Sequence, residues 1–206
     1  MLKNFNPIII IAGDPESVFL EIYFKSLKKN KFKNPLILIV NENILLKQMT
    51  ALKYDFKINK LDINNLNCKK LNNRKINIIH VPFNKKFLSK YIYQSFEKAL
   101  LLTKKNNKIN LINGPINKKK ILKQQFLGIT EYLDFKTKSK GKSVMLIYNK
   151  DLSVSPLTTH LPLKKVHKFI SKKRLINHVQ QITNFYRKRF NIIPKIGITG
   201  LNPHCE

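Results

Sequence analysis

The sequence predicts an α/β fold of three layers (α/β/α), in which helices cover both faces of a mixed, mostly parallel sheet. Short apolar runs rich in β-branched residues alternate with longer amphipathic stretches, which is the pattern of β–α–β units. The apolar runs contain few polar residues, so their strands are expected to be buried on both faces. The chain has no G-x-G-x-x-G or Walker A loop, so a Rossmann nucleotide site of the usual kind is not expected.

Six apolar runs are the expected strands. In chain order they are residues 7–13, 35–40, 76–81, 109–114, 142–148 and 195–200. The extended runs 142–149 and 152–160 are joined by two residues, which leaves no room for a helix. They are therefore predicted to form an antiparallel hairpin, and this hairpin is the reason to expect a mixed sheet.

Two of the intervening stretches are the clearest helices, because their apolar residues recur at spacings of three and four. The first is 85–105 and the second is 171–190. The residues on the two apolar faces are Leu88, Ile92, Phe96, Ala99 and Leu100 in the first, and Leu175, Val179, Ile182 and Tyr186 in the second.

The charge of the chain allows two interpretations. Its 206 residues include 40 Lys and Arg against 11 Asp and Glu, a net charge of +29. Such an excess is typical of a nucleic-acid-binding module. However, the lysines are mixed with Asn and Ile in every segment, Arg is rare and Trp is absent, which favours a compositional bias. Nucleic acid is therefore not the expected partner, and the binding module remains the alternative of another class.

The cysteines and the N-terminus predict a soluble, cytoplasmic protein without a membrane partner. Cys68 and Cys205 are too few for a disulfide framework, so a reducing compartment is expected. The first apolar run has only four consecutive Ile residues, which is too short for a signal peptide or a membrane span.

Three expected strands end at a glycine that is followed by polar residues. The carboxyl ends of parallel strands meet at one edge of a sheet, where ligands of open α/β folds bind. We therefore expect a site at this edge, although each segment taken alone also fits an ordinary turn. The glycines are Gly13, Gly114 and Gly200, and the polar residues are Asp14, Asn117, Lys118, Asn202 and His204.

Two of the five histidines also lie at strand ends. His160 and His204 each close an extended run beside a proline, and two neutral imidazoles suit a divalent cation. A catalytic metal usually takes three protein ligands, so spacing alone leaves a structural role for both histidines open. His167 and His178 are expected on solvated helix faces, and His80 is expected to be satisfied by the backbone.

Five motifs resemble one known family. They are "GDPESVFLEI" (13–22), "INGPINKK" (112–119), "GITEYL" (128–133), "TTHLPLKKV" (158–166) and "GLNPHCE" (200–206). Their order and spacing are similar to those of the 4-hydroxythreonine-4-phosphate dehydrogenase family of pyridoxal phosphate biosynthesis. The resemblance runs from residue 9 to residue 206, and "TTHLPL" and "GLNPH" are its specific parts.

The resemblance implies a fold like that of isocitrate and isopropylmalate dehydrogenases, and a homodimer with its active site at the interface. It implies NAD- or NADP-dependent oxidation of 4-phosphooxy-L-threonine to a 3-oxo acid, which decarboxylates to 3-amino-2-oxopropyl phosphate. A divalent metal (zinc, magnesium or cobalt) held by three histidines would bind the reacting oxygen. A family relative that oxidises another phosphorylated hydroxy acid, such as a threonate or erythronate phosphate, is the alternative.

Residue by residue, His160 and His204 match two metal ligands, and Thr130 matches a substrate-binding threonine. Lys118 is a further candidate for binding the substrate, and Ile129 stands where the family usually has histidine. The third ligand is absent from the chain, which is therefore expected to be C-terminally incomplete and inactive by itself. The resemblance implies a first α/β domain over 1–127 and the start of a second, metal-binding domain over 128–206.

Overall fold

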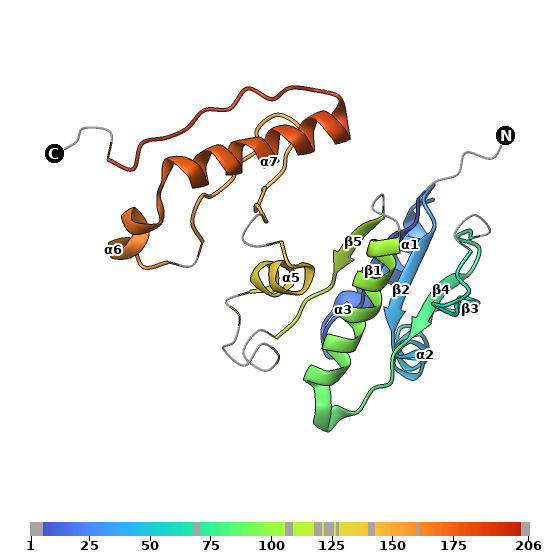
Figure 1. Cartoon of the computed structure of the whole chain (residues 1–206). Helices are drawn as coiled ribbons and strands as arrows, with labels where there is room; N and C mark the ends of the chain where they lie inside the picture. Colours follow the sequence, from blue (N-terminus) through green and yellow to red (C-terminus); the bar gives the residue numbers. More distant parts are fainter. Residues whose placement is uncertain are drawn as a thin grey trace. The chain divides into compact units, whose positions relative to one another are not determined.

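The protein forms two compact units, Met1–Gln124 and Gln125–Glu206. The computed structural model describes residues 6–67, 71–105, 109–117, 121, 126, 128–139, 143–159 and 161–202. Strands and helices alternate in the first unit, and the second is mainly helical (Figure 1).

The elements of the first unit are β1 (Ile8–Ile11), α1 (Phe19–Lys29), β2 (Leu36–Val40), α2 (Glu42–Ala51), β3 (Ile58–Lys60), β4 (Ile76–His80), the 3-10 turn Lys85–Phe87, α3 (Leu88–Lys105) and β5 (Asn110–Asn113). Those of the second unit are α5 (Ile129–Thr137), α6 (Leu163–Val166), the 3-10 turn His167–Phe169 and α7 (Lys172–Phe190).

The five strands form one sheet in the order β3-β4-β2-β1-β5. Every neighbouring pair is parallel, with Ile9 opposite Ile37 on one side of β1 and opposite Leu111 on the other. The α/β class and the mostly parallel sheet predicted from the sequence are therefore confirmed.

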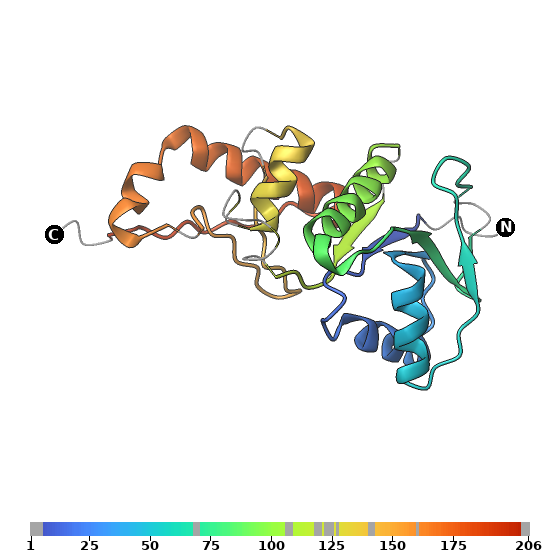
Figure 2. The ribbon, with the colours of Figure 1, turned by 90° about the horizontal axis from the view of Figure 1, so that it is seen from below.

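Helices cover both faces of the sheet, which explains why the strand sequences are apolar almost throughout. Figure 2 shows α1 and α2 on one side and α3 on the other. Alternate residues of a strand point to opposite faces. Thus Ile10 and Leu38 belong to the buried cluster beneath α1 and α2, whereas Ile9 and Ile37, which are also buried, point to the face covered by α3.

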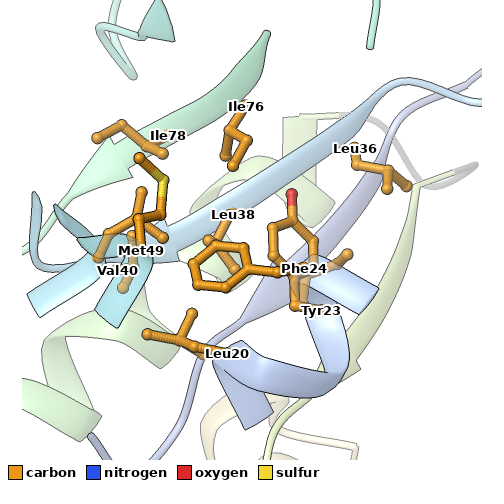
Figure 3. Packing of buried hydrophobic residues seen from close by; sticks show 12 residues of the cluster. Leu20, Tyr23, Phe24, Leu36, Leu38, Val40, Met49, Ile76 and Ile78 are labelled. Carbon is orange, nitrogen blue, oxygen red and sulfur yellow. The ribbon is translucent and has the colours of Figure 1, made fainter. Parts of the chain in front are cut away.

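The cluster beneath α1 is centred on Phe24, which is completely buried (Figure 3). Its ring packs against Tyr54 and Phe56, with ring centroids 5.3 and 5.9 Å away. These aromatic residues precede β3, so they hold the chain leading into this edge strand against the core. On the opposite face, Phe96 of α3 is equally buried.

Strand β3 was not predicted from the sequence, because only three residues pair and they alternate weakly. A side-chain network marks its position instead. Asn59 donates a hydrogen bond to Oδ1 of the buried Asn77 in β4 at 2.9 Å. The side-chain nitrogen Nδ2 of Asn77 in turn donates to the carbonyl oxygens of Leu36, at 3.0 Å, and Asn72, at 2.8 Å. The buried side-chain amide of Asn77 keeps these hydrogen bonds when Asn59 lies opposite it, so the network favours the observed register of β3 against β4.

The second unit is organised around α7, which begins after Ser171, whose side chain accepts a hydrogen bond from the Arg174 amide at 3.3 Å. The predicted apolar face of α7 is half-buried. Tyr148 stacks on Phe190 with centroids 5.2 Å apart, and Tyr186 lies 5.5 Å from the same ring. In the described part of this unit, Tyr132 is the one fully buried hydrophobic side chain.

One sequence prediction for this unit is confirmed in part, and a second fails. The expected hairpin is reduced to a single antiparallel bridge, in which Ile147 and Val154 exchange two hydrogen bonds of 2.8 and 3.0 Å. At the turn, the Ser153 hydroxyl accepts a hydrogen bond from the Asn149 backbone amide and donates one to the Asn149 carbonyl. These side-chain bonds stand where further bonds between the two strands would be expected. The run 195–200 is not a strand: Ile198 is 60% exposed, and no neighbouring strand pairs with it among the described residues. The sheet is consequently parallel, not mixed, within the same residues.

Across the residues that the structure describes, no helix is both long enough and apolar enough to cross a membrane.

Replacing the core residue Phe24 by Ala is expected to lower the free energy of unfolding of the first unit by about 3–5 kcal/mol, because it leaves a cavity beneath α1. The matched variant Ile22→Ala changes a residue of the same helix that is 55% exposed, and it should change the free energy by less than about 0.5 kcal/mol. Urea unfolding followed by circular dichroism measures both, and equal losses would contradict the packing described.

Candidate active site

The carboxyl ends of β1 and β5 are joined by direct backbone contacts. The Gly114 amide donates to the Ile11 carbonyl at 2.7 Å, and the Asp14 amide donates to the Pro115 carbonyl at 2.8 Å. On one side of β1 the chain adds β2 and then β4, and on the other side it adds β5. The strand order therefore reverses between β1 and β5. Ligands of open α/β sheets bind at such a point.

Both loops need glycine because they pack so closely. A Cβ atom on Gly13 would lie 2.3 Å from the Pro115 carbonyl oxygen, and one on Gly114 would lie 2.3 Å from the Ala12 carbonyl oxygen. Gly13 also has φ of +78°, a conformation that favours glycine. These glycines therefore serve the contact between the loops and are not a phosphate-binding loop.

Asp14 is fixed by a turn that leads into α1. Its Oδ1 accepts the Glu16 amide at 3.0 Å, and its carbonyl oxygen accepts the Ser17 hydroxyl at 2.7 Å. The side chain is half-buried, so one carboxylate lies at the edge of the sheet that the sequence predicted to hold a site.

Tyr91 of α3 and Asn41, which follows β2, extend the polar edge. The Asn41 amide donates to the Tyr91 hydroxyl oxygen at 3.3 Å, and the Asn41 side chain donates to the Val81 carbonyl at 2.9 Å. Burial raises the pKa of Tyr91 to about 12; the Asp14 charge also raises this pKa, and the bond from Asn41 lowers it. Tyr91 therefore stays protonated at neutral pH, beside the carboxylate of the neighbouring loop.

Sequence reasoning missed Tyr91 and Asn41. It selected polar residues that follow a glycine, whereas Asn41 follows the apolar run of β2 directly. The rule that found Asp14 would have found Asn41 if the glycine had not been required. Tyr91 carried no separate signal, because an aromatic residue on the apolar face of a helix usually belongs to the core.

The remaining predicted residues are only partly placed. Thr130 lies in the first turn of α5 with an exposed side chain, and Ile129 beside it is half-buried. The Asn117 carbonyl accepts a hydrogen bond from the Ile121 amide at 3.0 Å. Asn202 is exposed in the second unit, so its convergence with the β1 and β5 loops stays a prediction. Lys118, His160 and His204 lie outside the described residues, as do Cys68, Pro203 and Cys205.

The other histidines have structural surroundings. Nδ1 of His80 accepts the Glu42 amide at 3.3 Å, which confirms the predicted backbone partner. His167 is exposed, also as predicted. The prediction for His178 was wrong: it is half-buried and lies 2.6 Å from the Ser155 hydroxyl.

His178 and Tyr186 attach α7 to the segment that contains the antiparallel bridge. The Ser155 hydroxyl donates a hydrogen bond to the Met145 carbonyl at 2.5 Å. Its oxygen is therefore left to accept a hydrogen bond from the N–H at Nε2 of His178. Tyr186 donates to the Ser153 hydroxyl at 2.8 Å. Burial, and secondarily the nearby Arg174 charge, lower the pKa of His178, so the neutral ring is favoured. The Ser155–His178 pair is therefore a structural contact and not an activated nucleophile.

Among the described residues, no group of three or more His, Cys, Asp or Glu side chains could hold a metal ion. Both predicted ligands fall outside that part of the chain, so the metal site stays a prediction.

The first unit is a parallel α/β domain whose strand order reverses between β1 and β5, and its sequence has no glycine-rich phosphate loop. Residues 31–206 match the family model described as "Pyridoxal phosphate biosynthetic protein PdxA", and the chain belongs to this family.

Relatives and solved structures of similar proteins carry the name 4-hydroxythreonine-4-phosphate dehydrogenase. The protein of Sulfurihydrogenibium sp. is 39% identical over 82 residues, which are 39% of this chain and 25% of that protein. The protein of Hydrogenobaculum sp. is 28% identical over 95% of this chain and 64% of its own length. The crystal structure from Klebsiella pneumoniae has a TM-score of 0.80 at 20% identity, over 97% of this chain and 65% of the other.

The structural similarity supports the fold, which the two chains share despite their low identity. The chain spans 64% and 65% of the last two proteins, and its alignment with the first covers a quarter of that protein.

Replacing Gly114 by Ala should destabilise the first unit by about 1–3 kcal/mol, because the new methyl group meets the Ala12 carbonyl. Gly197→Ala is the matched control, since nothing lies within 4 Å of its Cβ position. Thermal unfolding of both variants tests the contact, and an undisturbed Gly114→Ala protein would contradict it.

Lowering the pH should loosen α7 from the bridge segment. The pKa of His178 is lowered in the folded state, so its neutral form contributes stability that is lost as pH falls below the usual value of 6.5. The change should occur between 6.5 and the lower folded pKa, and His178→Gln should remove it. NMR titration of the His178 ring measures this pKa; a value above 6.5 would contradict the burial of the ring.

Proposed function

We propose that the protein is an NAD(P)-dependent dehydrogenase that oxidises 4-phosphooxy-L-threonine to the 3-oxo acid, which then decarboxylates to 3-amino-2-oxopropyl phosphate. The observation that carries this proposal is family membership over residues 31–206, together with relatives named for this activity. The motifs "TTHLPL" and "GLNPH" lie within the matched range.

The proposal includes a divalent metal, zinc, magnesium or cobalt, held by His160, His204 and a third histidine from outside the chain. Neutral imidazoles suit such a cation. A cation bound there would supply Lewis-acid stabilisation of negative charge on the substrate oxygen.

Thr130 is proposed to bind the substrate. Its hydroxyl lies in the first turn of α5 and is exposed, so it is accessible as a hydrogen-bond donor. Lys118 would add a positive charge for the phosphate or carboxylate, on the segment that follows the fixed β5 loop. Ile129 has no polar atom on its side chain, so the contact made by the usual histidine must be replaced or lost.

The nicotinamide cofactor would accept the hydride, and the chain must bind it without the glycine-rich loop of Rossmann proteins. The loop region around Asp14 and Gly114 is the place that sheet topology favours for a ligand in the first unit. A homodimer with its active site at the subunit interface, which the resemblance to the family implies, completes the proposal.

The test is oxidation of 4-phosphooxy-L-threonine by the full-length protein, followed by the absorbance of the reduced nicotinamide. Turnover should require a divalent metal and disappear with a chelator. His160→Ala should reduce kcat at least about a hundredfold, because loss of an outer-shell partner alone costs about 10–100-fold. The control His167→Ala changes an exposed histidine and should keep full activity. Metal-independent turnover by His160→Ala would contradict the proposal.

A second substrate is favoured by one residue. Ile129 departs from the family pattern beside Thr130, so another phosphorylated hydroxy acid, such as a threonate or erythronate phosphate, is the competing substrate. Comparing kcat/KM for the three compounds decides between them, since all would use the same metal and cofactor. A higher value for the threonine derivative is expected, and a lower one would reassign the substrate.

A further inference from the structure

A cavity of about 220 Å³ opens in the first unit at the amino-terminal edge of the sheet. Leu36 and Ile76, the first residues of β2 and β4, line it together with the C-terminal part of α1. The loops after β1 and β5 lie at the opposite edge, roughly 15 Å away for strands of about five residues at 3.3 Å each. The cavity is therefore separate from the proposed active site.

Tyr23 contributes its hydroxyl group to this cavity. The residue is only 6% exposed, and Figure 3 shows its hydroxyl directed toward the side where Leu36 and Ile76 lie. Within the described part of the chain, this hydroxyl has no hydrogen-bond partner. Burial raises the pKa of Tyr23, so the group stays protonated and can donate. The hydroxyl is therefore able to donate a hydrogen bond to an acceptor in the cavity.

The walls and the rim differ in chemistry. Leu27, Phe32 and Phe56 provide apolar and aromatic walls, whereas the rim carries the exposed cations Lys31, Arg74 and Lys75. None of the described lining residues is acidic, and none of the three cations forms an ion pair with a described carboxylate. Lysine is common throughout the chain, so cations at the rim are not evidence by themselves. The combination of these cations with the Tyr23 hydroxyl and the aromatic walls is what indicates a ligand.

Hydrogen bonds of Asn73 organise one wall of the cavity. Oδ1 of Asn73 accepts the Leu36 amide at 2.8 Å, and its Nδ2 donates to the carbonyl oxygens of Phe32, at 3.0 Å, and Asn34, at 2.8 Å. One side chain thus fixes the loop after α1 to the start of β2, so little ordering is required on binding.

We propose that this cavity binds a small aromatic anion: one six-membered ring that carries a hydrogen-bond acceptor at one end and an anionic group at the other. A cavity of about 150 Å³ holds benzene, so the larger volume here leaves room for a ring and one substituent. The ring packs against Phe32 and Phe56. Its acceptor takes a hydrogen bond from the Tyr23 hydroxyl, and its anionic group lies beside Arg74. The proposal does not depend on the activity proposed above.

Isonicotinate and benzoate test the proposal as a matched pair of probes. They differ only at the ring position opposite the carboxylate, which is a nitrogen in isonicotinate and a C–H in benzoate. Calorimetric titration of the full chain should show saturable binding of both, with isonicotinate bound more tightly. Tyr23→Phe should weaken isonicotinate about three- to tenfold and leave benzoate unchanged, since only the donated hydrogen bond is removed. This variant loses no hydrogen bond within the described residues, so its unfolding temperature should be that of the native protein.

The charge requirement is tested with Arg74→Gln, which should weaken both anions about three- to tenfold. Arg174→Gln removes the same charge from α7 and should change neither affinity. Absence of saturable binding, an unchanged affinity ratio in Tyr23→Phe, or equal weakening by the two arginine variants would each overturn the proposal. Equally tight binding of the neutral 4-methylpyridine would do so as well.

Discussion

The backbone contact between the β1 and β5 loops is the constraint on which the first unit depends. Gly114 bonds to Ile11 and Asp14 bonds to Pro115, so two segments a hundred residues apart meet where the strand order reverses. No side chain larger than hydrogen fits at Gly13 or Gly114. The contact fixes β5 beside β1, orients the turn at Asp14 into α1, and places this carboxylate near the buried hydroxyl of Tyr91.

This arrangement gives the two edges of the sheet different chemistry. The carboxyl edge holds the polar residues Asp14, Asn41 and Tyr91, at the place where parallel sheets usually bind ligands. At the amino edge, the side chains of α1 and the loop before β4 leave a cavity with cationic residues at its rim. The second unit is held differently, since polar bonds from His178 and Tyr186 attach α7 to a segment with little buried surface.

The sequence predicted the buried part of the fold well because burial leaves a pattern. Four of the apolar runs became β1, β2, β4 and β5, and both predicted helices formed. It failed where pairing, not hydrophobicity, decides the structure: β3 is held by the Asn59–Asn77 bond, and residues 195–200 have no neighbouring strand in the described part. Likewise, glycine marked the loops at Asp14, whereas Tyr91 resembled a core residue and His178 a solvated one. The metal ligands were proposed from motifs alone, since two histidines far apart in sequence carry no periodic signal.

Family membership over residues 31–206 supports the dehydrogenase that we propose, and the loops after β1 and β5 lie together where a parallel sheet usually binds its ligand. The most direct test is the anomalous diffraction of cobalt in crystals of the full-length protein with 4-phosphooxy-L-threonine bound. We expect one strong peak about 2.0–2.1 Å from a ring nitrogen of both His160 and His204, with the substrate within reach of Thr130. A cobalt ion bound elsewhere, or a substrate that leaves both histidines without metal, would contradict the account.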